Sequence, residues 1–180
     1  MRHAAVRIFS MIEGTWSPGH APKHTRRKFL KEGEMDQTQL ERIIQKRLAL
    51  PEDEFKTIHE NPKFQRLFAN ALNAARYRLV ATVVESEGCH SQHRVGQSIV
   101  FDSSGNLLTA DAPERVCAFL LPNLVVLINA FFENLMNGRD PNEIMFNRTG
   151  CFDVGPACGG WGHVVVEMKA ELENYVKDVR

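Results

Sequence analysis

The segment from 149 to 163 holds the residue types best suited to chemistry. It contains five glycines together with Cys151, Asp153, Cys158, Trp161 and His163. Glycine lets the backbone approach a ligand closely and adopt positive φ. The two cysteines are separated by six residues, so a loop that folds back would bring both thiols toward one point. The segment is therefore a candidate binding or catalytic loop.

A second group of cysteine and histidine residues lies in the segment 88–93. Cys89 and His93 are four residues apart, and His90 follows Cys89 directly. If this turn meets the glycine-rich loop, a set of Cys and His side chains forms that suits tetrahedral zinc, and three or four thiolates also suit an iron–sulfur centre. The sequence therefore predicts a metal site formed by Cys89, His93, Cys151 and Cys158.

Two other interpretations of these cysteines remain open. Free cysteine is among the most buried residue types and packs like a small apolar side chain. Alternatively, Cys151 or Cys158 is a reactive thiol, with His163 or His93 as its base and Asp153 orienting that base. The chain has no C-x₂-C spacing, P-loop or H-E-x-x-H motif that would decide between these interpretations.

Cys117 lies apart from both groups, in the apolar segment 116–120. Its neighbours suggest that it packs in the core. It is a reserve ligand if the first turn of a helix there points toward the two loops, and a helix N-terminus would lower the pKa of its thiol.

The hydrophobic periodicity indicates which elements hold these residues. Helices are expected near 38–48, from Pro51 and from Pro62, because apolar residues recur at helical spacing there. Alternation at period two predicts a strand from Tyr77 to Gly88. The remaining expected elements are a strand over 93–102 with a short return at 107–109, a helix over 111–121, a buried apolar helix over 124–137, a brief strand over 143–147 and a last strand over 163–170.

This order of elements predicts an α+β fold, in which N-terminal helices precede a small antiparallel sheet with a buried apolar helix. In an antiparallel pair the end of one strand lies beside the start of the other. If the strand from Tyr77 pairs with the strand from His163, Cys89 lies close to Cys151 and Cys158. The topology therefore supports the predicted metal site.

Charge separates the chain into two parts. Residues 1–34 carry seven basic and three acidic residues, a net charge of +4, and the remaining residues carry 15 basic and 19 acidic residues, a net charge of −4. We expect residues 1–34 to be a flexible basic arm and residues 35–180 to be a single α+β domain. The acidic body argues against a nucleic-acid partner.

Four cysteines in 180 residues are too few for a disulfide-rich secreted protein, and the N-terminus shows no secretory signal. A reducing cytoplasm is therefore expected. The apolar segment 116–132 is shorter than the roughly 20 residues that span a bilayer, so no membrane is expected.

Residues from Tyr77 to Ala170 resemble a family of short prokaryotic cysteine-containing proteins of unknown function. The resemblance rests on Gly88-Cys89, Val95-Gly96, the segment from Pro113 to Cys117, the apolar segment from Leu124 to Phe132, and Cys151 with Cys158. The resemblance covers about half of the chain. It implies the layout of the strands and that the cysteines are the residues to examine. It implies no activity.

The sequence favours a zinc or iron–sulfur binding accessory protein, or a small subunit of an enzyme complex. One alternative is a small cysteine-dependent enzyme that acts on a small molecule. Another is a structural or oligomer-forming protein without a site. A protein partner or a second copy of the chain is compatible with each of these functions.

Overall fold

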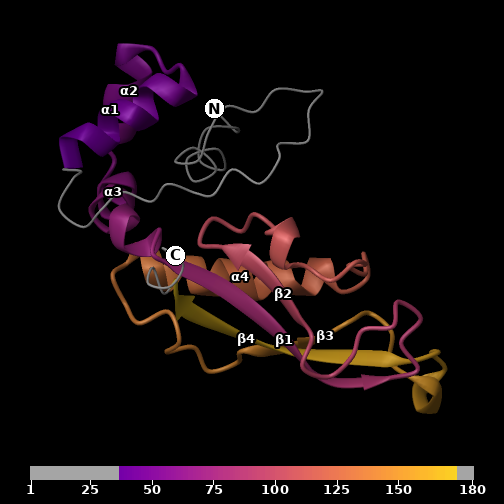
Figure 1. The fold of residues 1–180 in the computed structure, drawn as a ribbon. Coiled ribbons are helices and arrows are strands. Elements are labelled where there is room, and N and C mark those ends of the chain that lie inside the picture. The colour runs from indigo at the N-terminus through magenta and orange to yellow at the C-terminus, as the bar shows by residue number, and fades with distance from the viewer. Residues whose placement is uncertain (1–36, 174–180) are drawn as a thin grey trace, which may run out of the picture. The chain divides into compact units, whose positions relative to one another are not determined.

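The computed structural model describes residues 37–173, so the expected basic arm over 1–34 lies outside the described residues. Over the described range it confirms the α+β class, with four α-helices and one four-stranded antiparallel sheet (Figure 1). The elements are α1 (Gln37–Leu48), α2 (Glu52–His59), α3 (Pro62–Ala74), β1 (Tyr77–Glu87), β2 (Ser98–Asp102), α4 (Leu121–Met136), β3 (Arg148–Gly150) and β4 (His163–Leu172). Two short 3-10 helices, η3 (Thr109–Asp111) and η4 (Pro156–Cys158), complete them.

The chain divides into two compact units, and the division falls inside α3, between Ala69 and Asn70. Each unit is described by itself. The single domain expected over 35–180 stays a prediction.

The first unit holds α1, α2 and the first part of α3. The three acidic residues after Pro51 lie in the first turn of α2, where the positive end of the helix dipole favours negative charge. The rings of Phe55, His59 and Phe68 lie against one another, with centroid separations of 6.0–6.5 Å. The expected helices of this region are confirmed.

The second unit is built around β1. The strand order is β2-β1-β4-β3, and every neighbouring pair is antiparallel. β1 pairs with β4 from Tyr77↔Leu172 to Glu87↔His163, with one irregularity between Val83 and Glu85. The expected strands from Tyr77 and from His163 are therefore neighbours.

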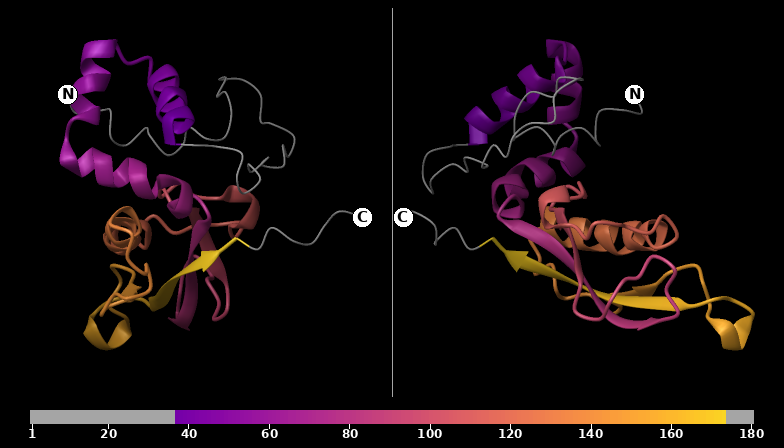
Figure 2. Two further views of the ribbon diagram at one scale, coloured as in Figure 1. Left: turned by 90° about the vertical axis from the view of Figure 1, so that its left-hand side faces the viewer. Right: turned by 45° about the vertical axis from the view of Figure 1, so that its right-hand side comes forward.

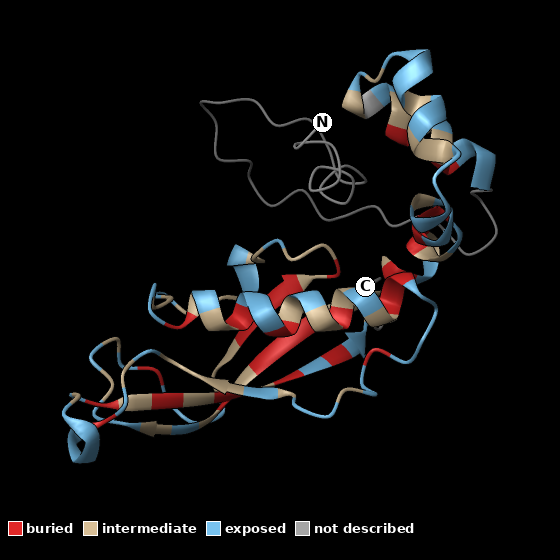
Figure 3. Cartoon of the chain, turned by 180° about the vertical axis from the view of Figure 1, so that it is seen from behind, coloured by how far each residue is buried: buried red, intermediate tan, exposed pale blue. Residues whose placement is uncertain are grey.

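Helix α4 covers one face of this sheet (Figure 2). Apolar side chains of the helix and alternate residues of the strands form one core: Leu79, Ala81, Val83, Ile99, Phe101, Leu120, Leu124, Leu127, Phe131, Val164, Val166, Met168 and Ala170. The buried positions alternate with partly exposed ones along most of β4 (Figure 3). The expected buried helix is confirmed, and no helix over residues 37–173 is long and apolar enough to cross a membrane.

Several local expectations are wrong. Residues 112–117 form no helix, and α4 begins at Leu121, so that Pro122 lies in the first turn of a helix instead of interrupting one. The strand expected over 143–147 is displaced to β3, at 148–150. β2 begins only at Ser98, and the expected return strand is reduced to a single bridge between Phe101 and Leu107.

Candidate functional site

The end of β1 lies directly beside the start of β4. The last pair of the ladder joins Glu87 to His163. Gly88 follows with a φ of +58°, and a Cβ atom on it would lie 2.8 Å from the carbonyl oxygen of Trp161. The turn after β1 and the loop before β4 therefore meet as the topology predicted.

Three of the four cysteines line one cavity at this end of the sheet. The cavity has a volume of about 380 Å³ and is lined by Cys89 after β1, Cys117 before α4 and Cys151 after β3. Each thiol is half-buried and packs against the core, and all four cysteines of the chain are free. Three segments that are distant in sequence thus bring three thiols to one cavity.

The observed set differs from the predicted one. Cys89 and Cys151 line this cavity, whereas Cys158 is exposed in η4 and His93 lines a different cavity. Cys117, the reserve ligand, lies in the cavity although the segment around it is not helical. Among residues 37–173, no three His, Cys, Asp or Glu side chains lie close enough together to hold a metal ion as they stand.

His93 links the loop after β1 to the segment before α4 through a hydrogen bond. Its side chain is 4% exposed, its Nε2 accepts a hydrogen bond from the Cys117 N–H at 3.3 Å, and its Nδ1 lies 3.3 Å from Gln97 Oε1. A ring nitrogen that accepts a hydrogen bond carries no proton, so the proton of the neutral ring is on Nδ1. The Nδ1–H group therefore donates a hydrogen bond to Gln97 Oε1. Both ring nitrogens are therefore occupied, and His93 positions Cys117 instead of offering a free metal ligand.

Asp153 organises the glycine-rich loop. Its carboxylate accepts hydrogen bonds from the backbone N–H groups of Gly155, Trp161 and Gly162 at 3.0–3.3 Å. Desolvation raises the pKa of this carboxyl, but the backbone N–H donors outweigh it and hold the pKa below its usual value. A Cβ atom on Gly160 would collide with the same carboxylate. The sequence suggested that the glycines of this loop allow a ligand to approach the backbone. Gly160 is instead required because the Asp153 carboxylate lies against it.

His163 lines the cysteine cavity and is paired with two glutamates. Its Nε2 lies 2.6 Å from Glu85 Oε1, and its Nδ1 lies 3.8 Å from Glu87 Oε2. The hydrogen bond to Glu85 and the negative charges nearby raise the pKa of His163 above its usual value. The lining of the cavity therefore combines three cysteines with a histidine that is held by a carboxylate.

Two of the residues that line the cavity carry exposed apolar side chains. Phe119 and Trp161 line it and are 69% and 80% exposed, and Phe152 and Val154 are also exposed. The Phe152 N–H donates to the Phe119 carbonyl oxygen at 3.2 Å, which ties the loop after β3 to the segment before α4. Exposed apolar side chains that gather in one place often mark a surface that binds another molecule.

No protein family, no curated protein and no solved structure matches this chain. The resemblance to short cysteine-containing proteins therefore stays a prediction.

Proposed function

We propose that the protein binds a thiophilic metal ion, with zinc the expected ion, through Cys89, Cys117 and Cys151. The observation that supports this proposal is the presence of these three thiols, from three separate segments, in the lining of one cavity. Thiolate is the soft ligand that zinc prefers in proteins. Cys158 and His93, both in the set expected from the sequence, are not part of the proposed site.

Binding requires a local change in the thiols. The Cys151 thiol donates to the carbonyl oxygen of Asp153 at 3.5 Å, whereas a metal ligand must be the thiolate. Rotation about χ1 redirects a cysteine sulfur between staggered positions, which allows sulfurs that line one cavity to converge on an ion. Metal binding therefore releases protons and strengthens as the pH rises.

We further propose that the protein acts as an accessory protein or a small subunit of an enzyme complex. Three protein ligands leave one position of a tetrahedral zinc ion open. The exposed Phe119 and Trp161 beside the cavity would pack against a protein partner that closes this position.

Elemental analysis of the purified full chain tests metal binding. Protein refolded or dialysed with zinc should retain about one ion per chain, and Cys89→Ser, Cys117→Ser and Cys151→Ser should each lower the retained zinc several-fold. Cys158→Ser is the matched control, because this cysteine is exposed and does not line the cavity. Equal retention of zinc by all four variants would contradict the proposal. A visible absorption band of the isolated protein would indicate that the bound group is an iron–sulfur centre and not zinc.

A second function, a cysteine-dependent enzyme acting on a small molecule, is favoured by one specific observation. His163, held by Glu85, lines the same cavity as the three thiols, and a histidine oriented by a carboxylate is the usual activator of a nucleophilic thiol. The rate of alkylation by iodoacetamide tests this alternative. One cavity cysteine that reacts much faster than Cys158 at neutral pH, and slows in His163→Gln, would support the enzyme, whereas uniform slow labelling would contradict it.

A further inference from the structure

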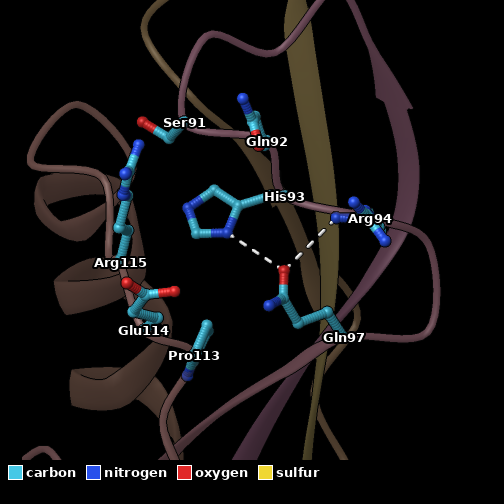
Figure 4. Close-up of a pocket in the computed structure, with 8 residues that line it drawn as sticks. All are labelled: Ser91, Gln92, His93, Arg94, Gln97, Pro113, Glu114 and Arg115. Atoms are coloured by element: carbon cyan, nitrogen blue, oxygen red, sulfur yellow. Dashed lines mark hydrogen bonds between the residues drawn. The ribbon is translucent and has the colours of Figure 1, made fainter.

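A second, polar cavity lies beside the cysteine cavity, and Ser91 lines both. Its volume is about 240 Å³, and its walls are the segment 91–97 after β1 and residues 113–115 before α4. Figure 4 shows Ser91 and Arg115 on one side of the His93 ring and Arg94 and Gln97 on the other. Seven of its eight lining residues carry polar or charged side chains, so the cavity suits a polar ligand.

The hydrogen bonds around His93 fix the orientation of Gln97. Gln97 Oε1 accepts from His93 Nδ1 and from the backbone N–H of Arg94, both at 3.3 Å. The oxygen must be the atom in this position, because the Arg94 N–H is a donor. The amide nitrogen of Gln97 therefore occupies the other position and retains its two N–H donors.

The charged groups of the cavity have no ion-pair partner among the described residues. Arg94, Arg115 and Glu114 make no salt bridge within residues 37–173. Two guanidinium groups and one carboxylate leave a net charge of +1 on the lining (2 − 1). Guanidinium is the side chain best suited to phosphate or carboxylate, since its N–H groups form parallel hydrogen bonds to two oxygens.

We propose that this cavity binds a small oxyanion, a phosphate or carboxylate group, through the guanidinium groups of Arg115 and Arg94 and the amide N–H groups of Gln97. His93 contributes no further bond to the ligand, because both of its ring nitrogens are occupied. Its role is instead to orient the Gln97 amide through the hydrogen bond from Nδ1. Glu114 weakens the attraction for an anion and is therefore expected to limit affinity.

Inorganic phosphate is the probe for this site. Increasing phosphate is added to the ¹⁵N-labelled full chain at fixed pH and fixed ionic strength, with sodium chloride as the balancing salt, and amide shifts are followed by NMR. Saturable shifts are expected for Arg94, Gln97, Arg115 and Cys117, the last because its N–H donates to His93. Absence of saturable shifts in these residues would overturn the proposal.

Variants separate a specific site from a general effect of salt. Arg115→Gln should weaken phosphate binding at least about tenfold, as expected for the loss of a charge-assisted hydrogen bond, and Arg94→Gln should also weaken it. Arg139→Gln is the matched control, because Arg139 is exposed and does not line the cavity. Glu114→Gln should strengthen binding by removing a like charge. Unchanged affinity in both Arg115→Gln and Arg94→Gln, or weaker binding in Glu114→Gln, would overturn the proposal.

Discussion

Gly88 and Gly162 approach each other so closely that neither has room for a side chain. A Cβ atom on Gly88 would lie 2.8 Å from the Trp161 carbonyl oxygen and 3.3 Å from the Gly162 Cα, and a Cβ atom on Gly162 would collide with the Gly88 carbonyl group. The obstructing atoms belong to the backbone and cannot turn away. This contact joins the end of β1 to the start of β4 and brings Cys89 to the loop that holds Cys151.

Gly162→Ala should therefore destabilise the protein by about 1–3 kcal/mol, because the backbone of two strands must separate to admit a methyl group. Gly159→Ala is the control, since a Cβ atom there meets nothing within 4 Å and only the positive φ of +85° is unfavourable, at a cost of about 1–2 kcal/mol. Urea unfolding measures the free energy of unfolding of both variants. A smaller effect for Gly162→Ala than for Gly159→Ala would contradict the close approach.

Leu127→Ala should lower the free energy of unfolding by about 2–5 kcal/mol. Leu127 lies on the face of α4 that packs on the sheet and is 6% exposed. Val126→Ala, one residue away but 68% exposed, should change stability by less than about 0.5 kcal/mol. Similar values for the two variants, measured by denaturant unfolding, would show that α4 does not present this face to the core.

Glu85→Gln should lower the pKa of His163. The hydrogen bond to Glu85 raises that pKa in the folded protein, so the pair stabilises the fold fully below the unfolded pKa of about 6.5. This contribution is lost as the pH rises through the raised folded value. The stability difference between the natural protein and the variant should therefore be larger at about pH 6 than at about pH 9.

An NMR titration of the His163 ring follows the pKa directly. Glu87→Gln should lower it less than Glu85→Gln, because Glu87 lies 3.8 Å from the ring instead of 2.6 Å. If Glu85→Gln leaves the pKa of His163 unchanged, the ion pair at the cavity does not form in solution.

Asp153→Asn should loosen the glycine-rich loop. The backbone N–H groups of Gly155, Trp161 and Gly162 all donate to this carboxylate, and an amide would direct a donor toward one of them. Hydrogen exchange over residues 151–163 should accelerate in the variant, whereas Asp111→Asn in η3 should leave it unchanged. In the natural protein the same loosening should appear as the pH falls through the lowered pKa of Asp153. Unchanged exchange in Asp153→Asn would show that the carboxylate does not hold the loop.

The longest elements of the second unit were predictable because their hydrophobic patterns are long. Apolar residues run through most of β1 (Tyr77–Glu87), alternate along β4 (His163–Leu172) and recur along α4. Each of these elements buries apolar side chains in the same core. The segment 111–121 has helix-start signals but forms no α-helix before Leu121. Leu120 is buried, and Val116, Cys117 and Leu121 pack partly buried against the core. A pattern of residue types does not distinguish this packing from that of a helix.

The candidate site was predicted only in part. Strand pairing brought Cys89 and Cys151 to one cavity, and pairing follows from the order of the elements. Spacing alone does not determine which way a side chain faces. The structure therefore has His93 in the lining of the neighbouring cavity, Cys158 exposed, and Cys117 in the lining of the cysteine cavity. The role of Asp153 had a signal that was missed: an aspartate two residues before a glycine commonly accepts a hydrogen bond from that N–H, as Asp153 does from Gly155.

The central claim is that Cys89, Cys117 and Cys151 bind one ion together. X-ray absorption at the zinc edge of the zinc-loaded full chain tests it most directly. The proposed site predicts about three sulfur neighbours at about 2.3 Å, falling to about two in Cys117→Ser and unchanged in Cys158→Ser. Retained zinc with only nitrogen and oxygen neighbours at about 2.0–2.1 Å, or no retained zinc, would contradict it.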